Sequence, residues 1–263
     1  FLTVFHCLDS DCSESLSSAE QNAVNQWTFI FNYKKGCGNG AINAGVSYNG
    51  AIFRAGNFDS DFALLELFSN LTNALNSHAW LGWDKSGNTP TSGTYIHHPN
   101  GAPMKISFDY QPLALKTDNF TWNSCAGSTV LFANTHWKTI LDNGVVQGGS
   151  SGSPLLNQNK RIVGQLHGGK ASCSYDETTY SGAFHKSWIG GGTNTTRLSN
   201  WLDPNNSGIQ TINTSYLPVI SGANIICPHD NPHNYYISGI PSNSNVTWTC
   251  TGGISITPNG SSC

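Results

Sequence analysis

The chain has 263 residues, of which 10% are charged, and its formal net charge is −3. It has no basic stripe of the kind that neutralises phosphates, which excludes a nucleic-acid-binding function. It also lacks an apolar run near the roughly 20 residues that span a bilayer. The eight cysteines show no Cys-x-x-Cys or Cys/His ligand spacing. They predict disulfides rather than zinc, and hence an exported globular protein.

The first elements in chain order are a short strand and a helix. The stretch FLTVFH (1–6) predicts a buried strand that ends at a histidine. The stretch 17–27 predicts a helix, because Ser17 and Glu20 have the spacing of a capping box and apolar residues recur every four positions.

A series of short β segments follows, separated by turn-like Gly, Asn and Pro residues. The segments are 27–33, 51–56, 61–67, 95–99, 105–110, 128–133 and 161–166. This pattern is typical of a sandwich or a barrel, so the predicted fold class is all-β. The stretch 197–204 predicts a short helix that Pro204 ends.

The sequence pattern changes near residue 217. From Val246 to Cys250 apolar and polar residues alternate strictly, which indicates a half-buried antiparallel strand. We expect two domains, 1–216 and 217–263. Residues 217–263 resemble the opening strands of an immunoglobulin-like module of bacterial surface and secreted proteins, and they are too few to close a sandwich.

The stretch GGSSGSPLL (148–156) is rich in Gly and Ser, which alone is typical of a flexible linker. Its flanks contradict a linker, because Val145 and Val146 precede it and the buried segment 161–166 follows. A serine-rich turn between buried strands is a rigid loop, where catalytic residues tend to lie. A nucleophilic serine needs a base, a carboxylate that orients the base, and donors for the oxyanion.

Three motifs resemble those of trypsin-like serine proteases. GSSGSP (149–154) resembles Gly-Asp-Ser-Gly-Gly-Pro, which implies that Ser151 is the nucleophile. The backbone amides of Gly149 and Ser151 would then form the oxyanion hole. Ser150 stands where those enzymes carry the Asp that pairs with a new N-terminal amine after zymogen cleavage. Activation is therefore expected to work in another way.

The base and its carboxylate come from earlier motifs. LTVFHC (2–7) resembles Leu-Thr-Ala-Ala-His-Cys and implies that His6 is the base. SDFALLEL (60–67) resembles Asp-Ile-Ala-Leu-Leu and implies that Asp61 orients it. The order His6, Asp61, Ser151 is the chymotrypsin order. It disfavours a lipase or esterase, whose Gly-x-Ser-x-Gly elbow belongs to another order.

Most of residues 1–216 resemble the bacterial lysyl endopeptidases, a secreted branch of the chymotrypsin fold. The stretches that carry the resemblance are HHPNG (97–101), KIS (105–107), GSSGSP (149–154), RIVGQLHGG (161–169) and GGGTNTTRLSNWLDPNNSG (190–208). The resemblance implies a two-barrel chymotrypsin-like fold, with the first barrel incomplete at its N-terminus. It also implies chemistry without a metal or organic cofactor.

The resemblance also implies a substrate-binding strand. In that family the QLHGG strand pairs with the substrate backbone, so we expect Leu166, His167 and Gly168 to bind the residues before the scissile bond. The family histidine matched by His167 lies beside the catalytic histidine and stacks on a tryptophan, for which Trp122 is the counterpart here. The alternative for His167 is a strand-end histidine that faces solvent.

The resemblance departs at the primary specificity pocket. In lysyl endopeptidases an aspartate a few residues before a tyrosine selects lysine. That tyrosine is matched by Tyr180, and counting back without gaps places Thr178 at the aspartate position. Glu177 or Asp176 supplies the charge if the register slips, and Val145 occupies the other usual position of a pocket acid. Lysine specificity is therefore a conjecture.

The comparison with the family further predicts that the chain is a fragment. His6 comes at once, so the strands that precede the catalytic histidine in a two-barrel fold are expected upstream. In lysyl endopeptidases three matching cysteines bond to partners in that upstream region. We therefore expect three cysteines to be free, or mispaired with Cys12 or Cys125: Cys7, Cys37 and Cys173.

Together these patterns predict a secreted serine endopeptidase that acts on proteins or peptides through an acyl-enzyme, with cleavage after Lys as one specificity. The alternative is a non-catalytic, protease-like adhesion or binding module of a multidomain surface protein. Nucleic acid is not an expected partner. The sequence leaves the oligomeric state open.

Overall fold

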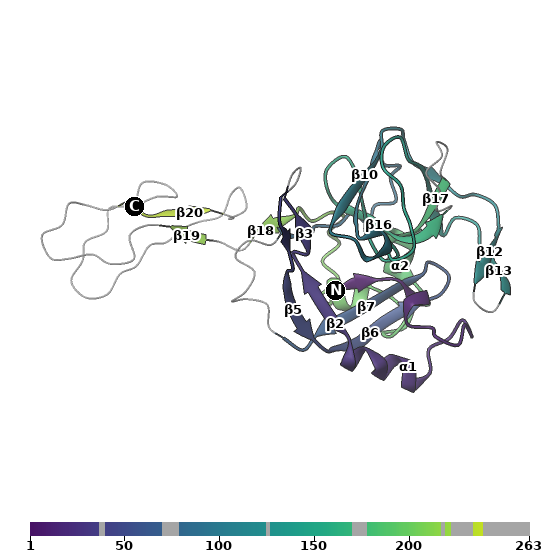
Figure 1. Cartoon of the computed structure of the whole chain (residues 1–263). Helices are drawn as coiled ribbons and strands as arrows, with labels where there is room; N and C mark the ends of the chain where they lie inside the picture. The colour runs from purple at the N-terminus through teal and green to yellow at the C-terminus, as the bar shows by residue number, and fades with distance from the viewer. Residues whose placement is uncertain are drawn as a thin grey trace, which may run out of the picture. The chain divides into compact units, whose positions relative to one another are not determined.

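The computed structural model describes residues 1–36, 40–69, 79–124, 127–169, 178–216, 219–221 and 234–238. The chain separates into two compact units, Phe1–Ser69 with Gly82–Asn213 and Asn70–Leu81 with Thr214–Cys263. The described part of the first unit consists mainly of strands, with a few short helices (Figure 1). The all-β class expected from the sequence is confirmed.

The first unit has two β-rich halves. The first half contains β1 (Leu2–Thr3), β2 (Thr28–Phe31), β3 (Lys34–Lys35), β4 (Ile42–Asn43), β5 (Val46–Asn49), β6 (Ala51–Asn57) and β7 (Phe62–Leu67). The second contains β9 (Gly93–His97), β10 (Lys105–Asp109), β11 (Ala114–Leu115), β12 (Phe120–Ser124), β13 (Gly127–Leu131), β14 (His136–Ile140), β15 (Pro154–Leu156), β16 (Ile162–Gly169) and β17 (Thr178–Ala183). The helices are α1 (Ser18–Ala23), α2 (Phe184–Ile189) and α3 (Ser199–Leu202), with 3₁₀ turns η1 (Phe5–Cys7), η2 (Val24–Gln26) and η4 (Pro99–Gly101).

Helix α1 begins at the predicted capping box. The Ser17 side chain accepts the Glu20 N–H at 3.3 Å, and Glu20 Oε2 accepts the Ser17 N–H at 2.9 Å. The hydrogen bonds from Ser17 lower the pKa of Glu20 to about 2. The helix is shorter than the predicted 17–27, because η2 replaces it from Val24 and the backbone becomes extended at Trp27.

Strands β1, β7 and β6 form a three-stranded antiparallel sheet in the first half. Its register pairs Leu2 with Leu64 and Thr3 with Ala63. The predicted strand over 1–6 is therefore only partly correct. It ends early because the His6 N–H donates to an Asp61 carboxylate oxygen rather than to a strand. The buried core of this half consists of Leu8, Val24, Phe29, Ala51, Ala63 and Leu65.

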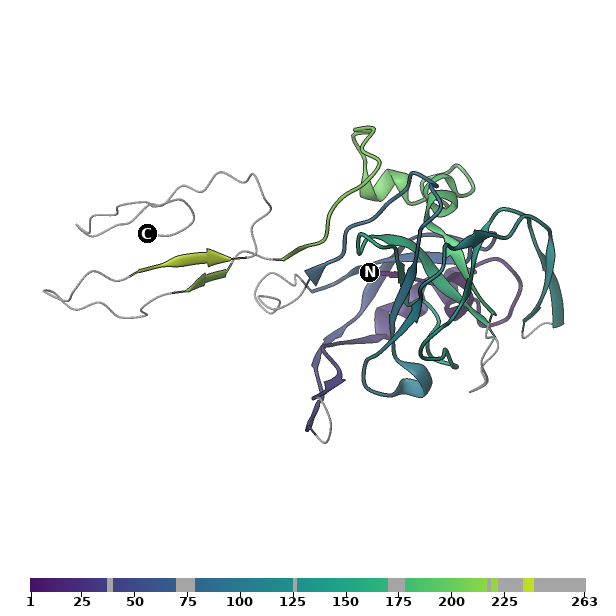
Figure 2. The same cartoon turned by 90° about the horizontal axis from the view of Figure 1, so that it is seen from above.

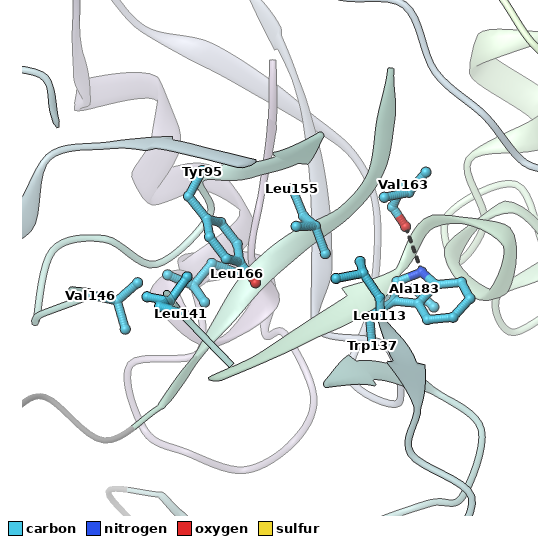
Figure 3. Close-up of a cluster of buried hydrophobic side chains, with 9 residues drawn as sticks. All are labelled: Tyr95, Leu113, Trp137, Leu141, Val146, Leu155, Val163, Leu166 and Ala183. Carbon is cyan, nitrogen blue, oxygen red and sulfur yellow. Dashed lines mark hydrogen bonds between the residues drawn. The ribbon is translucent and has the colours of Figure 1, made fainter. Parts of the chain in front are cut away.

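The second half is a seven-stranded sheet in the order β10-β9-β15-β16-β17-β14-β11. Figure 3 shows its core, in which Trp137 Nε1 donates to the Val163 carbonyl at 3.0 Å. The Tyr95 hydroxyl lies among the same side chains and is 2.8 Å from Ser181 Oγ, so its polar end is satisfied inside the core. Two β halves with separate cores give the expected two-barrel architecture.

A third apolar cluster joins strands of the first half to the helices of the second. Its buried members are Ala55, Phe62, Leu64, Trp83, Phe184 and Leu198. Helix α2 contributes Phe184 and packs Trp188 against Trp83, with ring centroids 4.7 Å apart. The sequence analysis missed α2. It did predict α3 within 197–204, and that helix ends just before Pro204.

The described part of the second unit consists of two antiparallel strand pairs. Strand β8 (Ala79–Trp80) pairs with β18 (Ser215–Tyr216), and β19 (Val219–Ser221) pairs with β20 (Tyr236–Ser238). The alternating stretch 246–250 lies outside the described residues. The immunoglobulin-like module and the boundary at 216/217 stay predictions. Across the described part of the chain, no helix has the length and hydrophobicity needed to cross a membrane.

Candidate active site

The pairing of β1 with β7 brings His6 next to Asp61. His6 closely follows β1 and Asp61 directly precedes β7, so the two residues meet at one end of the sheet. The His6 N–H donates to Asp61 Oδ1 at 2.9 Å, and His6 Nδ1 lies 2.8 Å from Asp61 Oδ2. The Asp61 side chain is 2% exposed and that of His6 is 38% exposed. Asp61 thus holds the imidazole with Nδ1 protonated, and leaves Nε2 as the nitrogen with a free lone pair.

This contact shifts the pKa values of both groups. Burial opposes the charged imidazole, but the adjacent Asp61 carboxylate outweighs it and raises the pKa of His6 to about 10. Burial likewise opposes the charged form of Asp61, yet the nearby His167 and His6 rings lower the pKa of its carboxyl. The Asp61 carboxylate therefore stabilises the charged imidazole, and the lone pair on Nε2 belongs to the neutral form of His6.

Contacts from the second half hold the turn that carries Asp61. Gln165 Nε2 on β16 donates to the Ser60 carbonyl at 2.7 Å. Ser60 Oγ lies 3.0 Å from Ser187 Oγ on α2. The turn itself is closed by the Asp61 N–H, which donates to the Phe58 carbonyl at 3.0 Å. Both β halves therefore fix the position of this carboxylate.

Ser151 lies on a loop between Val146 and β15 that the structure holds rigidly. Within it, the Gly152 N–H donates to the Leu166 carbonyl at 2.9 Å, and the Leu166 N–H donates to the Ser153 carbonyl at 2.8 Å. Gly152 has φ +81°, and a Cβ there would overlap Thr3 Oγ1. Strand β1 thus packs directly on the serine loop, which excludes the flexible-linker interpretation.

Backbone donors at Gly149 and Ser151 in this loop have no acceptor among the described residues. The N–H groups of Ser150, Gly152 and Ser153 each donate to a backbone carbonyl. The hydrogen bonds within the described residues give no acceptor to the N–H groups of Gly149 and Ser151. Gly149 adopts φ +84°, a conformation that favours glycine. An unpaired amide at Gly149 and another at Ser151 are what an oxyanion hole requires.

The Ser151 hydroxyl makes its hydrogen bond to the backbone of β16. Ser151 Oγ is 3.5 Å from the carbonyl oxygen of His167, to which it donates. Among the described residues no hydrogen bond joins Ser151 Oγ to a ring nitrogen of His6. Catalytic hydrogen bonds are often long in an unliganded protein and tighten when substrate binds.

His167 on β16 lies between the His6–Asp61 pair and an aromatic hairpin. Its ring stacks on His6 with centroids 5.2 Å apart, and the Trp122 ring centroid lies 4.4 Å from it. His167 is 5% exposed, so it is not a solvent-facing strand-end histidine. Trp122 belongs to β12, whose hairpin with β13 extends away from the seven-stranded sheet in both views (Figure 1, Figure 2).

A second buried histidine lies behind His167. His136 Nε2 on β14 lies 3.0 Å from His167 Nδ1, and His136 Nδ1 lies 2.8 Å from Thr135 Oγ1. The Thr135 hydroxyl donates to the Phe132 carbonyl, so it accepts from His136 Nδ1–H. His136 Nε2 then accepts from His167 Nδ1–H, which also lies 3.5 Å from Asp61 Oδ2.

Burial keeps both of these rings neutral. It lowers the pKa of His136 to about 3 and also lowers the pKa of His167. The sequence analysis missed His136, which lies inside an ordinary strand pattern with no motif around it. The only available signal was the presence of nine histidines in a chain with few charges.

The other residues that the sequence predicted to bind substrate differ in burial and in the elements they contact. Leu166 is 1% exposed and uses both its backbone groups on the serine loop, so it supports that loop rather than facing a substrate. Gly168 lies under Trp122, whose ring a Cβ at Gly168 would touch at 2.8 Å. Thr178 is half-buried and begins β17. Glu177 lies outside the described residues, as does Asp176.

A pocket of about 260 Å³ lies on the His6 side of the site. Its walls come from the segment after His6, from the Asp61 turn and from the β12–β13 hairpin. The lining residues are His6, Asp9, Cys12, Glu14, Phe58, Trp122, Asn123, Thr129 and His167. Thr129 Oγ1 donates to Glu14 Oε1 and so connects two of these walls. The site therefore has open space next to His6.

Within the part of the chain that the structure describes, two groups of side chains bring potential metal ligands together. Those of His6, Asp61 and His167 lie within 4.8 Å of one another, as do those of Asp9, Asp11 and Glu20. The Asp61 oxygens already accept two hydrogen bonds from His6, and Glu20 accepts from Ser10, Asp11 and Ser17. These internal hydrogen bonds account for both groups.

Two of the eight cysteines belong to the described residues. Cys7, next to His6, is an exposed free thiol, as the sequence analysis allowed. Cys12 is disulfide-bonded. The expectations for Cys37 and Cys173 concern residues outside the described part.

Two solved protease structures align with part of this chain. The active form of the Rv3671c protease from M. tuberculosis is 17% identical, with a TM-score of 0.37 over 59% of this chain and 63% of that chain. The Cellulomonas bogoriensis chymotrypsin is 15% identical, with a TM-score of 0.35 over 51% of this chain and 68% of that chain. The chain thus spans less than two thirds of the M. tuberculosis protease.

These structural similarities are weak, and the sequence of the chain gives the stronger relation. Residues 1–185 match the family model of the lysyl endopeptidase C-terminal domain. That segment is more than half of the chain, and it contains His6, Asp61 and Ser151 with the surroundings described above. The chain belongs to the lysyl endopeptidase C-terminal domain family.

Proposed function

We propose that the chain is a secreted serine endopeptidase that hydrolyses peptide bonds in proteins through a Ser-His-Asp triad. The observation that carries the proposal is the combination of a tightly held His6–Asp61 pair with two unused backbone donors at Gly149 and Ser151. The His6 Nδ1 to Asp61 Oδ2 distance is 2.8 Å. A binding module would need neither the oriented imidazole nor the unpaired amides.

In the proposed mechanism His6 Nε2 removes the proton of Ser151 Oγ while that oxygen attacks the peptide carbonyl carbon. Asp61 keeps the imidazole in the required tautomer and stabilises the imidazolium that forms. The carbonyl oxygen becomes an oxyanion, which accepts hydrogen bonds from the Gly149 and Ser151 amides. The peptide C–N bond then breaks as His6 returns the proton to the leaving amine, and an acyl-enzyme remains.

Water completes the reaction. His6 takes a proton from the attacking water, the second oxyanion occupies the same two amides, and Ser151 leaves with the proton from His6. The residues needed for both steps are present in the chain. We propose no metal or organic cofactor for this chemistry.

The proposed substrate side of the site is the C-terminal end of β16, next to Trp122. Gly168 and the backbone of His167 would pair with the residues before the scissile bond, next to Trp122. We propose lysine as the residue before that bond, with Glu177 or Asp176 as the counter-charge. A buried ammonium needs such a partner, because desolvating it alone costs several kcal/mol.

We propose that the protein is exported, since its cysteine usage suits an oxidising compartment and Cys12 is disulfide-bonded. The segment from 217 onward would be an accessory β module of immunoglobulin-like type. The proposed partner is a protein or peptide substrate, and no nucleic acid is expected.

The test combines covalent labelling with digestion of a protein substrate. A fluorophosphonate should modify Ser151 stoichiometrically, and sequencing of the digestion products should show cleavage after one side-chain class. Replacing both Glu177 and Asp176 with their amides should remove a preference for Lys. Absence of both labelling and cleavage would leave the chain as a protease-like binding module, the alternative from the sequence.

A further inference from the structure

The HHPNG stretch (97–101) has no role in the mechanism above, yet it packs against the serine loop. Strand β9 ends at His97, and η4 follows over Pro99–Gly101. Inside this turn Asn100 has φ +51°. The turn is therefore a defined, non-helical structure, which we call the HHPNG turn.

Backbone and side-chain bonds join the HHPNG turn to the loop that carries Ser151. The Asn100 N–H donates to the Gly148 carbonyl at 2.7 Å, and Asn100 Nδ2 donates to Gln147 Oε1 at 3.1 Å. A Cβ at Gly149 would lie 3.2 Å from the His98 carbonyl oxygen. The turn thus lies directly against the segment that supplies the two unused amides.

The third connection is buried. His97 is 1% exposed and Ser150 is fully buried, and His97 Nδ1 lies 2.8 Å from Ser150 Oγ. On its other side His97 Nε2 lies 3.0 Å from Ser107 Oγ on β10. The Ser107 hydroxyl donates to the Val145 carbonyl, so it accepts from His97 Nε2–H.

This arrangement fixes the proton positions. Because Nε2 carries the proton, His97 Nδ1 accepts from the Ser150 hydroxyl. Ser150 Oγ in turn accepts the Gln147 N–H at 3.3 Å. Burial lowers the pKa of His97 and keeps the ring neutral, which this acceptor role requires. A series of hydrogen bonds therefore connects the Ser151 loop, through Ser150 and His97, to Ser107 on β10.

Ser150 stands where the trypsin-like motif has an aspartate, and that aspartate is tied to an N-terminal ammonium. In this chain Ser150 stands at the position of that aspartate, and its hydroxyl is hydrogen-bonded to the neutral imidazole of His97. Ser150 lies between the two residues whose amides are unused, so a bond to its side chain restrains both of them. The restraint involves no charged pair.

We propose that the HHPNG turn, through His97 and Asn100, is a positioning element that holds the 147–151 loop with the Gly149 and Ser151 amides presented to the oxyanion. His97 acts through Ser150 and touches no substrate. The proposal deepens the proposed function and rests on it. It assigns to this chain an oxyanion loop ordered by a neutral histidine instead of an ion pair.

The test compares three variants of the full chain. His97→Phe removes both hydrogen bonds, His97→Asn keeps a polar atom near the position of Nδ1, and Ser150→Ala removes the partner on the loop. Loss of one oxyanion donor costs about 10²–10³ in kcat. A loosened donor should cost less, so we expect His97→Phe and Ser150→Ala to lower kcat by roughly 10–100-fold with KM little changed.

Two further results would be specific to a positioning role of His97: recovery of kcat by a conservative variant, and a non-additive loss in a double variant. His97→Asn should recover most of kcat. The double variant His97→Phe/Ser150→Ala should lose no more than either single variant, because both remove one connection. His185→Phe is the matched control, since His185 is a half-buried histidine packed on Trp137, and it should leave kcat unchanged.

Hydrogen exchange of residues 147–153 gives a readout that needs no activity. Exchange there should rise in His97→Phe and stay near wild type in His97→Asn and His185→Phe. Wild-type kcat and unchanged exchange in His97→Phe would overturn the inference, as would an equal kcat loss in His185→Phe. If the wild-type chain neither cleaves nor reacts with a fluorophosphonate, the proposed function fails, while the exchange data still decide whether His97 orders the loop.

Discussion

The imidazole of His167 stacks on that of His6, with centroids 5.2 Å apart and an interplanar angle of 22°. Burial lowers the pKa of His167, so the ring that covers His6 is neutral. A charged neighbour at this distance would oppose the imidazolium that the proposed mechanism forms at His6. The neutral ring covers His6 without that repulsion.

Ser151→Ala should abolish peptidase activity, because the other hydroxyls of the loop are engaged elsewhere: Ser150 is fully buried and Ser153 Oγ donates to a backbone carbonyl. Loss of a triad member typically lowers turnover by about 10⁴–10⁶. Steady-state kinetics on a peptide substrate measure the effect. Ser153→Ala is the neighbour control and should keep most activity, since Ser153 Oγ donates only to the Ser150 carbonyl. If Ser153→Ala abolished peptidase activity and Ser151→Ala did not, Ser151 would not be the nucleophile.

Asp61→Asn should change both the rate and its pH dependence. The Asp61 carboxylate raises the pKa of His6 to about 10 against burial, so the free base forms only as the pH rises well above 6.5. We expect kcat/KM of the wild type to increase into the alkaline range. In Asp61→Asn the acidic limb should move to lower pH, while kcat falls by about 10⁴ because the wrong tautomer is favoured. If the acidic limb of the pH profile stayed at the same pH in Asp61→Asn, a group other than His6 would control the pH dependence of kcat/KM.

His136→Phe should destabilise the fold through His167. It removes the acceptor 3.0 Å from His167 Nδ1 and leaves only Asp61 Oδ2 at 3.5 Å. A buried donor without a good acceptor costs about 1–3 kcal/mol. Urea unfolding curves measure this loss. His136→Gln places an amide oxygen near the Nε2 position and should recover part of it; equal stability of the wild type and both variants would contradict the predicted hydrogen bond.

Gly152→Ala should impair both folding and activity. Its φ of +81° is strained for alanine, and the added Cβ would overlap Thr3 Oγ1. Strained left-handed backbone costs on the order of 1–3 kcal/mol, before the clash is counted. Thermal unfolding of Gly152→Ala and of Gly152→Ala/Thr3→Ala separates the two terms. The double variant should be the more stable one, and no difference between them would show that the backbone strain alone matters.

The sequence is most informative where a short motif lies at the edge of an apolar strand. Such motifs predicted that His6 and Asp61 act together, and the structure brings their side chains to 2.8 Å; the catalytic roles of these residues and of Ser151 stay predictions. The capping box of α1 was likewise a local pattern, in which Ser17 and Glu20 satisfy each other.

Contacts between residues that lie far apart in the sequence could not be predicted from local motifs. His136 meets His167 only because β14 and β16 both flank β17, and this strand order has no trace in either segment. The bond between His97 and Ser150 joins residues 53 positions apart. The motif around Leu166 predicted a contact with substrate, but it gave no sign that both backbone groups of Leu166 bond to the serine loop.

The bond from Gln165 Nε2 to the Ser60 carbonyl has a consequence for the order in which the chain is made. Chains leave the ribosome N-terminal half first, so His6 and Asp61 emerge well before Ser151. A nascent chain that has just passed Ser151 still lacks Gln165, which secures the Asp61 turn. Under the proposed mechanism the three triad residues can therefore take up their positions only after β16 has been made and has docked.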